Sequence, residues 1–377
     1  MPGLALSPAI NQISTTAFPD IPLGSIQTVL ALASFTQPLS AVIAAFLINR
    51  RVVTKKIAII FGLCLYVLNA VLAILFHTEF WHLIMLSIVL GISTGCVHPN
   101  MFGLLFDNFE VGERQVITGY QSALLNAGVI SMSLVVGLLA TFIWYGGYLV
   151  LFVGLPAVFL VLFAVPNYWA PVTGRQKKKA SGKLNPKIFY YCAIAFLFMM
   201  VYTVGGQNLS THMKDLGDSS TAGIGIALLM AGGVISGLFL NKLSILTGDY
   251  TLSFAMGALF IGFMMLSLFP GSLIMVFIAV FIAGSSLSIA LPRCIFMVST
   301  LATDQSSSQT ATALVSTVTP ALGGFMSPVV FTNITTALYG DSTVARYMFV
   351  SIVVLVMAII VALITFLSGR KRARAVP

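Results

Sequence analysis

Long apolar stretches alternate with short polar connections along nearly the whole chain. Eleven of these stretches run for about 20 residues or more, the length at which a helix crosses a bilayer. They lack the strict alternation of apolar and polar positions typical of barrel strands, so each predicts a membrane-spanning α-helix. The predicted spans are residues 23–49, 57–76, 80–106, 115–140, 146–166, 188–212, 221–246, 251–269, 273–299, 308–334 and 345–367.

Two pairs of short segments repeat along the chain at almost the same distance. Residues 91–99 read GISTGCVHP and residues 284–292 read GSSLSIALP, 193 positions later. Residues 45–50 read AFLINR and match GLFLNK at residues 237–242, 192 positions later. Weak similarity between two apolar halves is typical of transporters that arose by duplication, with the substrate site between the halves.

Residues 1–17 look like the outer part of one more span, which ends at the turn Phe18-Pro19-Asp20. Counting this partial helix as span 1 gives twelve spans. The repeat offset pairs residue 1 with Ile194, already inside a span, so we expect the chain to start a turn or two late. Either the first helix is short, or this sequence lacks the natural N-terminus.

Composition supports a membrane protein, because 58% of the residues are hydrophobic and only 8% are charged, whereas soluble domains carry about 25% charged residues. The net charge of +9 does not indicate nucleic-acid binding, since Lys and Arg lie between the apolar runs. With twelve spans, 16 of the 19 basic residues fall on one side; Lys214 and Arg346 fall on the other, and Arg293 lies within a span. The positive-inside rule then predicts a cell (inner or plasma) membrane protein whose C-terminus and residues 167–187 are cytoplasmic.

Several classes of function find no support in the residues. Cys64, Cys96, Cys192 and Cys294 fall inside apolar runs at wide spacing and form no disulfide or zinc pattern. No arrangement of nucleophile, base and oxyanion-binding groups suggests an enzyme, and no glycine-rich nucleotide loop suggests ATP-driven transport. We therefore expect no cofactor and no metal.

Six spans, a basic connection and six more spans resemble the major facilitator superfamily. The likeness divides the chain into a first bundle (1–166), a cytoplasmic linker (167–187), a second bundle (188–369) and a basic tail (370–377). It implies an all-α polytopic membrane protein with two pseudo-symmetric six-helix bundles, which rock around a site near the bilayer midplane. We expect the chain to work as a monomer in the lipid bilayer.

The family's loop between spans 2 and 3 typically reads Gly-x-x-x-Asp-Arg-x-Gly-Arg-Arg/Lys, and residues 45–56 here read AFLINRRVVTKK. By this likeness Asn49 stands for the aspartate and Arg50 for the arginine, with Asn241 and Lys242 as counterparts in the second half. The family's acidic residue pairs with basic groups and latches one conformation, so Asn49 implies a weaker latch or a neutral hydrogen bond. The span 4 stretch, residues 83–91, lacks the arginine of proton-coupled members, which leaves the coupling ion open.

All ten carboxylates lie in loops or at span ends, which leaves His98 and Arg293 as ionisable groups inside spans. Such groups are costly in a membrane and often functional. Arg293 either binds an anionic group of the solute through paired hydrogen bonds or extends to the cytoplasmic interface. His98 either couples a proton to transport or is a hydrogen-bonded core histidine. The repeat offset puts Asn100 opposite Arg293, so Asn100 is a further candidate contact.

Matched prolines and a glycine-amide segment add to the candidate site. Pro99 and Pro292 lie at equivalent positions in the two halves and can kink their helices during a rocking motion. Gln207 and Asn208 follow the glycine pair at 205–206. Their amides either bind polar groups of the solute or are solvated near the outer interface.

Span 5 carries two further amides, Gln121 and Asn126, as candidate contacts. Asn126 shares one helix face with Gly119, Ser122, Ser133 and Gly137. This face either lines a cavity and bends with the transport cycle, or packs closely against another helix through its small residues.

The leading interpretation is a secondary active transporter that moves a small organic solute by alternating access. Arg293 favours an anionic or amphipathic solute, with a proton as one possible coupling ion. The Met and Phe content and the apolar cavity candidates keep a multidrug efflux exporter as the alternative. The altered loop motif and the short first span also leave a non-transporting membrane sensor or assembly partner open.

Overall fold

The computed structural model describes residues 9–110, 113–140, 142–167, 185–216, 221–301, 311–340 and 342–374. Every regular element in these ranges is helical, which confirms the all-α class. Within them, ten helical stretches are long and apolar enough to cross a membrane, and Ala222–Leu238 adds a shorter apolar helix. With the partial helix at the start, they agree with the twelve predicted spans.

The first half of the chain opens with a short helix, α2 (Ile10–Gln12), that continues as a π-helical turn, η2 (Ile13–Ala17). Thr54 caps the third span, because its hydroxyl accepts a hydrogen bond from the Ile57 backbone N–H. The spans of this half are α3 (Leu23–Asn49), α4 (Lys55–Leu75), α5 (Phe80–Asn108), α6 (Arg114–Ala140), and a sixth made of α7 (Gly146–Leu149), η3 (Val150–Val153) and α8 (Gly154–Ala164).

The second half begins with the 30-residue helix α9 (Pro186–Asp215). Its other elements are α10 (Ala222–Leu238), α11 (Leu240–Thr247), η5 (Gly248–Tyr250), α12 (Thr251–Leu268), α13 (Leu273–Leu301), η6 (Leu314–Val318), α15 (Thr319–Ser327), η7 (Pro328–Thr332), α16 (Asn333–Tyr339) and α17 (Thr343–Arg374). Both π-helical segments of the eleventh span, η6 and η7, adjoin prolines, which remove a backbone donor from the regular helix ladder. The predicted connection at 167–187 lies mostly outside the described residues, and so does the end of the predicted tail.

One predicted span, 221–246, is wrong in its extent. The helix α10 stops at Leu238, because the backbone of Phe239 leaves the helical region at φ −95° and ψ 6°. The chain then restarts as α11 and continues towards α12. Apolar residues run across this break, so hydrophobic periodicity alone does not reveal it.

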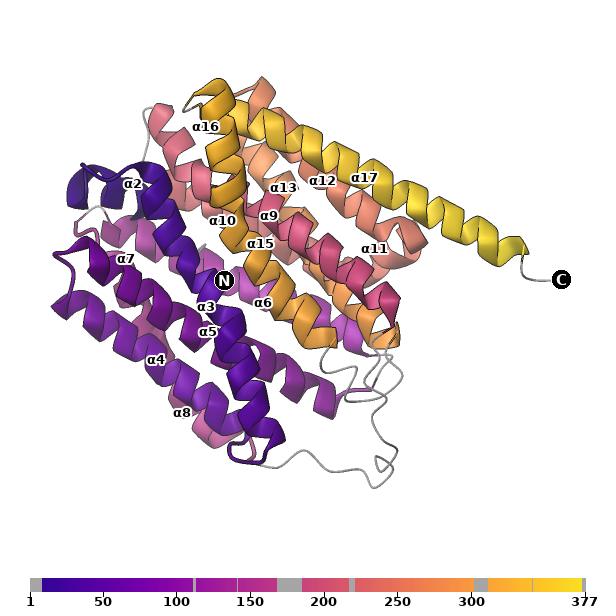
Figure 1. The fold of residues 1–377 in the computed structure, drawn as a ribbon, viewed down its shortest axis with the longest axis horizontal. Coiled ribbons are helices and arrows are strands. Elements are labelled where there is room, and N and C mark those ends of the chain that lie inside the picture. Colours follow the sequence, from indigo (N-terminus) through magenta and orange to yellow (C-terminus); the bar gives the residue numbers. More distant parts are fainter. Residues whose placement is uncertain are drawn as a thin grey trace.

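Buried apolar side chains form two separate clusters, one for each half of the chain. The first draws on α2 through η3 and includes Ile26, Leu86 and Leu151. The second draws mainly on α9 through α17 and also takes in Phe102 and Val129 from the first half. The halves meet where α3 lies beside α15 and where α6 packs on α10 (Figure 1).

The repeated glycines occupy equivalent packing positions. A side chain at Gly91 on α5 would overlap the Ala33 carbonyl of α3, and one at Gly284 on α13 would overlap the Leu229 carbonyl of α10. Glycine therefore permits the same close helix contact in each half. The sequence repeat thus marks a structural repeat.

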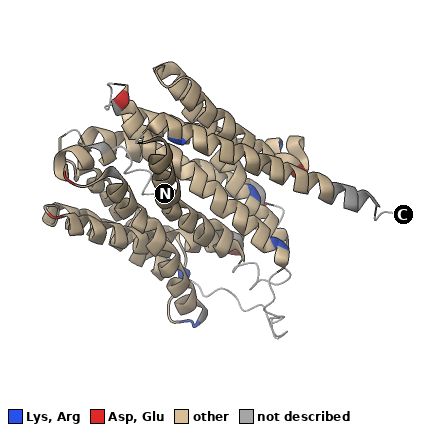
Figure 2. Ribbon diagram, turned by 45° about the horizontal axis from the view of Figure 1, so that its top comes forward, with Lys and Arg blue, Asp and Glu red and all other residues tan. Residues whose placement is uncertain are grey.

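Charged residues are sparse along the helices and gather mainly towards their ends (Figure 2). We call the end with Arg50, Arg51, Lys56 and Lys242 the basic end, and the opposite end, with the turn at 18–22, the far end. At the basic end Lys55 of α4 forms an ion pair with Asp107 of α5, Nζ to Oδ2 2.5 Å. This pair ties two helices of the same half together.

Candidate functional site

A cavity of about 160 Å³ lies between the two halves, at mid-height of the helices. Helices α2, α3, α5 and α6 line it from the first half, and α9, α13, η6 and α15 line it from the second. Among the described residues that line it there is no Lys, Arg, Asp or Glu. Its position between the halves is where a transporter built by duplication holds its solute.

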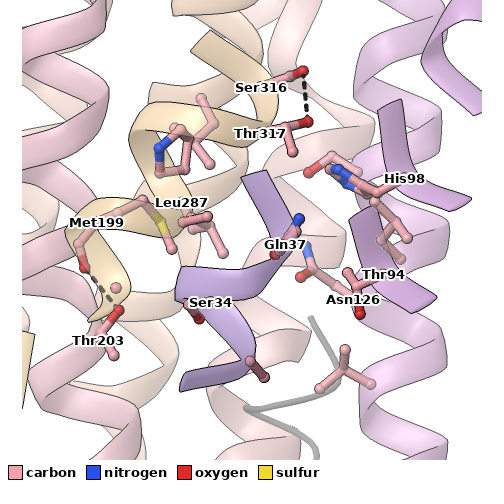
Figure 3. A pocket seen from close by; sticks show the side chains of 18 of the residues that line it. Ser34, Gln37, Thr94, His98, Asn126, Met199, Thr203, Leu287, Ser316 and Thr317 are labelled. Atoms are coloured by element: carbon pink, nitrogen blue, oxygen red, sulfur yellow. Dashed lines mark hydrogen bonds between the residues drawn. The ribbon is translucent and has the colours of Figure 1, made fainter. Parts of the chain in front are cut away.

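Polar side chains reach this cavity as pairs spaced three or four residues apart, one pair on each of four helices. That spacing puts both members of a pair on one face of a helix. Figure 3 shows side chains from several of these helices converging on one space. The pairs are Ser34 with Gln37 on α3, Thr94 with His98 on α5, Ser122 with Asn126 on α6, and Thr203 with Gln207 on α9.

Some of these polar groups are already hydrogen-bonded within the protein. Thr94 and Thr203 each donate to a carbonyl one turn earlier in their own helix. Ser122 Oγ and Asn126 Nδ2 both donate to Ser288 Oγ on α13, at 2.9 and 2.7 Å. The Ser288 hydroxyl therefore joins α6 of the first half to α13 of the second.

Four polar side chains of the cavity make no hydrogen bond within the described part of the chain. They are Ser34, Gln37, His98 and Gln207. The His98 Nδ1 atom is fully buried without a partner, and its ring stands edge-on to Phe102 at 5.1 Å. An unsatisfied buried polar atom is costly, so His98 favours a bound hydrogen-bonding group, and Ser34, Gln37 and Gln207 are free to bind a molecule that enters the cavity.

Much of the remaining wall is apolar. Met199, Leu287, Leu291 and Ile295 contribute large side chains from the second half. Three of the four unpartnered polar groups come from the first half, on α3 and α5. The second half still adds polar side chains to the lining, at Thr203, Gln207, Ser316 and Thr317, so both halves present polar and apolar groups to the cavity.

The predicted candidates separate into two groups. His98, Asn126, Gln207 and Pro292 line the cavity. The structure puts the others outside the lining: Asn100, Gln121, Asn208, Pro99 and Arg293. Asn100, for example, is buried and donates to the Cys96 carbonyl of its own helix at 2.7 Å.

Arg293 is predicted either to bind an anionic group of the solute or to extend to the cytoplasmic interface, and in the structure its side chain is hydrogen-bonded to the protein. Nη1 donates to Ser244 Oγ at 2.9 Å and Nη2 donates to the Gly248 carbonyl at 3.2 Å. Its guanidinium also lies 5.7 Å from the centre of the Phe296 ring. The arginine follows a proline that faces the cavity, but it points towards the basic end, where α11 meets η5.

The loop-motif residues lie at the basic end. The Arg50 guanidinium stacks over Phe46, 4.4 Å from the ring centre, and Lys242 lies over Phe239 in the other half. Asn241 is exposed, and the Asn49 side chain lies outside the described part of the structure. The ion pair described above uses Lys55, at the end of the motif, with Asp107.

Sequence reasoning missed several polar residues of the cavity: Ser34, Gln37, Thr94, Thr203, Ser316 and Thr317. One feature of the sequence could have identified most of these residues. Four helices carry a polar pair at helical spacing inside an otherwise apolar span. A single Ser or Thr in a span is common, but a pair on one face gives that face a polar character that lipid does not favour.

Comparison with solved structures finds transporters of the same fold. The nucleoside transporter NupG superposes with a TM-score of 0.63 at 11% identity, covering 97% of this chain and 96% of that chain. A mutant of the same transporter gives 0.66 at 10%, covering 97% and 95%. The human organic anion transporter MFSD10 (TETRAN) gives 0.67 at 14%, covering 96% and 97%. No curated protein matches the sequence.

The sequence match agrees with the fold. The family model of the Major Facilitator Superfamily matches residues 2–328, most of the chain. That match covers both halves and every helix that lines the cavity. The chain therefore belongs to the Major Facilitator Superfamily and is a multi-pass membrane protein with a transporter fold.

Proposed function

We propose that the chain is a secondary transporter that carries a small, uncharged, polar organic solute through the cavity between its halves by alternating access. One observation carries this proposal: the cavity has four unpartnered polar side chains and, among its described lining residues, no charged one. A charged solute would lose its hydration there without gaining an opposite charge, which is unfavourable. A neutral polar solute would exchange its hydrogen bonds with water for hydrogen bonds with these four side chains.

The size of the cavity limits the solute. A cavity of about 150 Å³ holds a molecule the size of benzene, and this one measures about 160 Å³. A single ring with polar substituents fits, with the substituents towards Gln37 and His98 and the ring against Leu287 and Met199. Gln37 presents a hydrogen-bond donor and an acceptor together, so it suits a solute edge that carries both.

Transport requires the solute to bind the two conformations differently. The lining residues come from both halves, so a bound solute contacts both. Three hydrogen bonds of the described residues already cross between the halves. Ser122 and Asn126 donate to Ser288, and Gln27 Nε2 donates to the Gln207 carbonyl at 3.5 Å. Rocking of the halves would break and remake such bonds. A solute that competes for Asn126 or Gln207 would therefore shift the equilibrium between the two conformations.

A multidrug exporter remains the second candidate, because the apolar wall includes the adaptable side chain of Met199. The two functions differ in what binds. A solute carrier is expected to select one class of neutral polar compounds, whereas an exporter is expected to bind unrelated lipophilic compounds.

The test is solute uptake by proteoliposomes, after a thermal-shift screen of neutral, anionic, cationic and lipophilic compounds to find ligands. Gln37→Ala should raise the KM for the best neutral solute by up to about tenfold, the effect of losing one hydrogen bond. Asn333→Ala is the matched control, since Asn333 is an exposed amide bonded only to its own helix among the described contacts. Saturable uptake of anions alone would contradict the proposal, and shifts scattered among lipophilic compounds would favour the exporter.

A further inference from the structure

Arg346 is the largest fully buried side chain of the described structure, with 1% of its surface exposed. The sequence predicts it at the outer end of a span and assigns it no role. In the structure the residue lies in the first turn of α17, inside the second half near the far end. A guanidinium there is costly unless hydrogen bonds compensate for its lost hydration.

The guanidinium joins three helices. Nη1 donates to Asn208 Oδ1 on α9 at 3.0 Å, and Nη2 donates to Thr336 Oγ1 on α16 at 3.1 Å. The next residue, Tyr347, is fully buried between the Phe263 and His212 rings, at 6.0 and 5.7 Å between ring centres. The arginine is thus held in place by its own helix as well as by its hydrogen bonds.

Asn208 is oriented to receive this bond. Its Nδ2 donates to the Val204 carbonyl at 2.9 Å, which leaves its Oδ1 for Arg346. The residue before it, Gln207, faces the other way: its side chain lines the cavity and its carbonyl accepts the hydrogen bond from Gln27 of the first half. Consecutive residues of α9 therefore bind the arginine on one side and the cavity and opposite half on the other.

A weak point in α9 lies just before these residues. Gly205 and Gly206 are adjacent inside the helix, and glycine is unfavourable at interior helix positions because it leaves the backbone freer to change conformation. A side chain at Gly205 would also overlap the Phe263 ring, so the close packing there depends on glycine. Contacts with other helices hold the segment beyond the glycine pair. The bond from Arg346 to Asn208 is one of them, beside the contact between the His212 and Tyr347 rings.

We propose that Arg346 is a positioning residue for transport: it holds the far-end segment of α9 against α16 and α17, so that Gln207 keeps the far end of the cavity closed. Loss of the bond to Asn208 lets this segment bend at the glycine pair and opens the cavity towards the far end. The role in transport rests on the proposed function, whereas the effect on opening does not.

The test measures access to the cavity directly. In a chain whose four native cysteines are replaced by serine, Thr203→Cys puts one thiol on the cavity wall. Its labelling by a membrane-impermeant maleimide is followed from each face of the membrane, in cells and in inverted vesicles. Single cysteines at exposed Asp20 and Arg50 identify the far-end and basic-end faces. Arg346→Met should raise labelling from the far-end face about tenfold, equivalent to about 1.4 kcal/mol.

Matched variants separate positioning from general damage. Asn208→Leu should raise far-end labelling as Arg346→Met does, and the double variant should add little, because both variants remove the bond between Arg346 and Asn208. Asn208→Asp keeps an acceptor and should retain the low labelling of the parent. Arg293→Met removes an arginine with two hydrogen bonds at the opposite end of the same half, and it should leave far-end labelling unchanged.

Variants are compared only if each elutes as a single species in size-exclusion chromatography and unfolds cooperatively. If Arg346→Met does not fold, Asn208→Leu still tests the proposal. Unchanged far-end labelling in both variants would overturn it, as would an equal rise with Arg293→Met. Uptake assays on the chain with Thr203 intact separate the two proposals, because Thr203 lines the cavity. A labelling response to Arg346→Met, together with no uptake of any solute by the chain with Thr203 intact, supports the positioning role and contradicts the transport function.

Discussion

The two ionisable residues singled out inside the predicted spans, His98 and Arg293, have different surroundings in the structure. His98 faces the cavity with an unpartnered nitrogen, while both ends of the Arg293 guanidinium are bound to Ser244 and Gly248. His98→Gln should therefore raise the KM for the transported solute by up to about tenfold, the effect of one lost hydrogen bond. Arg293→Met should change the KM by no more than about twofold, as expected for a residue away from the site. Initial uptake rates over a range of solute concentrations check both.

A larger effect of Arg293→Met than of His98→Gln on KM would contradict this assignment and favour an anionic solute. The surroundings of a single residue can be predicted only in part from the sequence. The chain predicts that both groups lie within helices, but the direction of a side chain depends on the neighbouring helix. Ser244 lies 49 positions from Arg293 in the sequence, and nothing in the local pattern links them.

Helix positions were predicted well, because long apolar runs bounded by polar turns leave little choice in a membrane. The span 23–49 agrees with α3 at both ends. The errors fall where apolar residues continue through a change of backbone, as at Phe239, or where prolines introduce π-helical turns, as in the eleventh span. Such features depend on packing between helices, which hydrophobicity does not encode.

Close helix packing at the repeated glycines leads to a prediction for the elements. Gly284→Ala should destabilise the protein, because a methyl group there would overlap the Leu229 backbone, and overpacking costs about 1–3 kcal/mol. Gly257→Ala on α12 is the matched control. Nothing lies within 4 Å of its added carbon, and alanine favours a helix over glycine by about 1 kcal/mol.

Thermal unfolding of the purified variants in detergent distinguishes the two effects. Gly284→Ala should lower the midpoint, and Gly257→Ala should leave it unchanged or raise it. Equal shifts of the unfolding midpoint for both variants would mean that the contact between α10 and α13 accommodates an added methyl group at little cost in stability. In that case the repeat at Gly91 and Gly284 would have to be explained by something other than packing.

At the scale of the whole molecule, alternating access requires the halves to move relative to each other. Ser122 on α6 and Ser288 on α13 face each other across the halves with their hydroxyl oxygens 2.9 Å apart. Cysteines at these two positions, in a chain without other cysteines, should form a disulfide on mild oxidation, because the side chains are already close enough. That bond would tie the halves together beside the cavity. Uptake should fall to background on oxidation and recover with a reductant.

Each single-cysteine variant treated with the same oxidant serves as the control, and its uptake should not change. We expect the loss of uptake to come from blocked motion rather than from a blocked cavity. Ser122 lines the cavity, so solute binding is measured separately from uptake. Solute binding to the oxidised protein, measured by thermal shift, should therefore persist while uptake is lost. Uptake that survives complete cross-linking would show that the contact between α6 and α13 stays closed through the cycle. The moving contacts would then lie elsewhere, with the far-end segment of α9 as the next region to test.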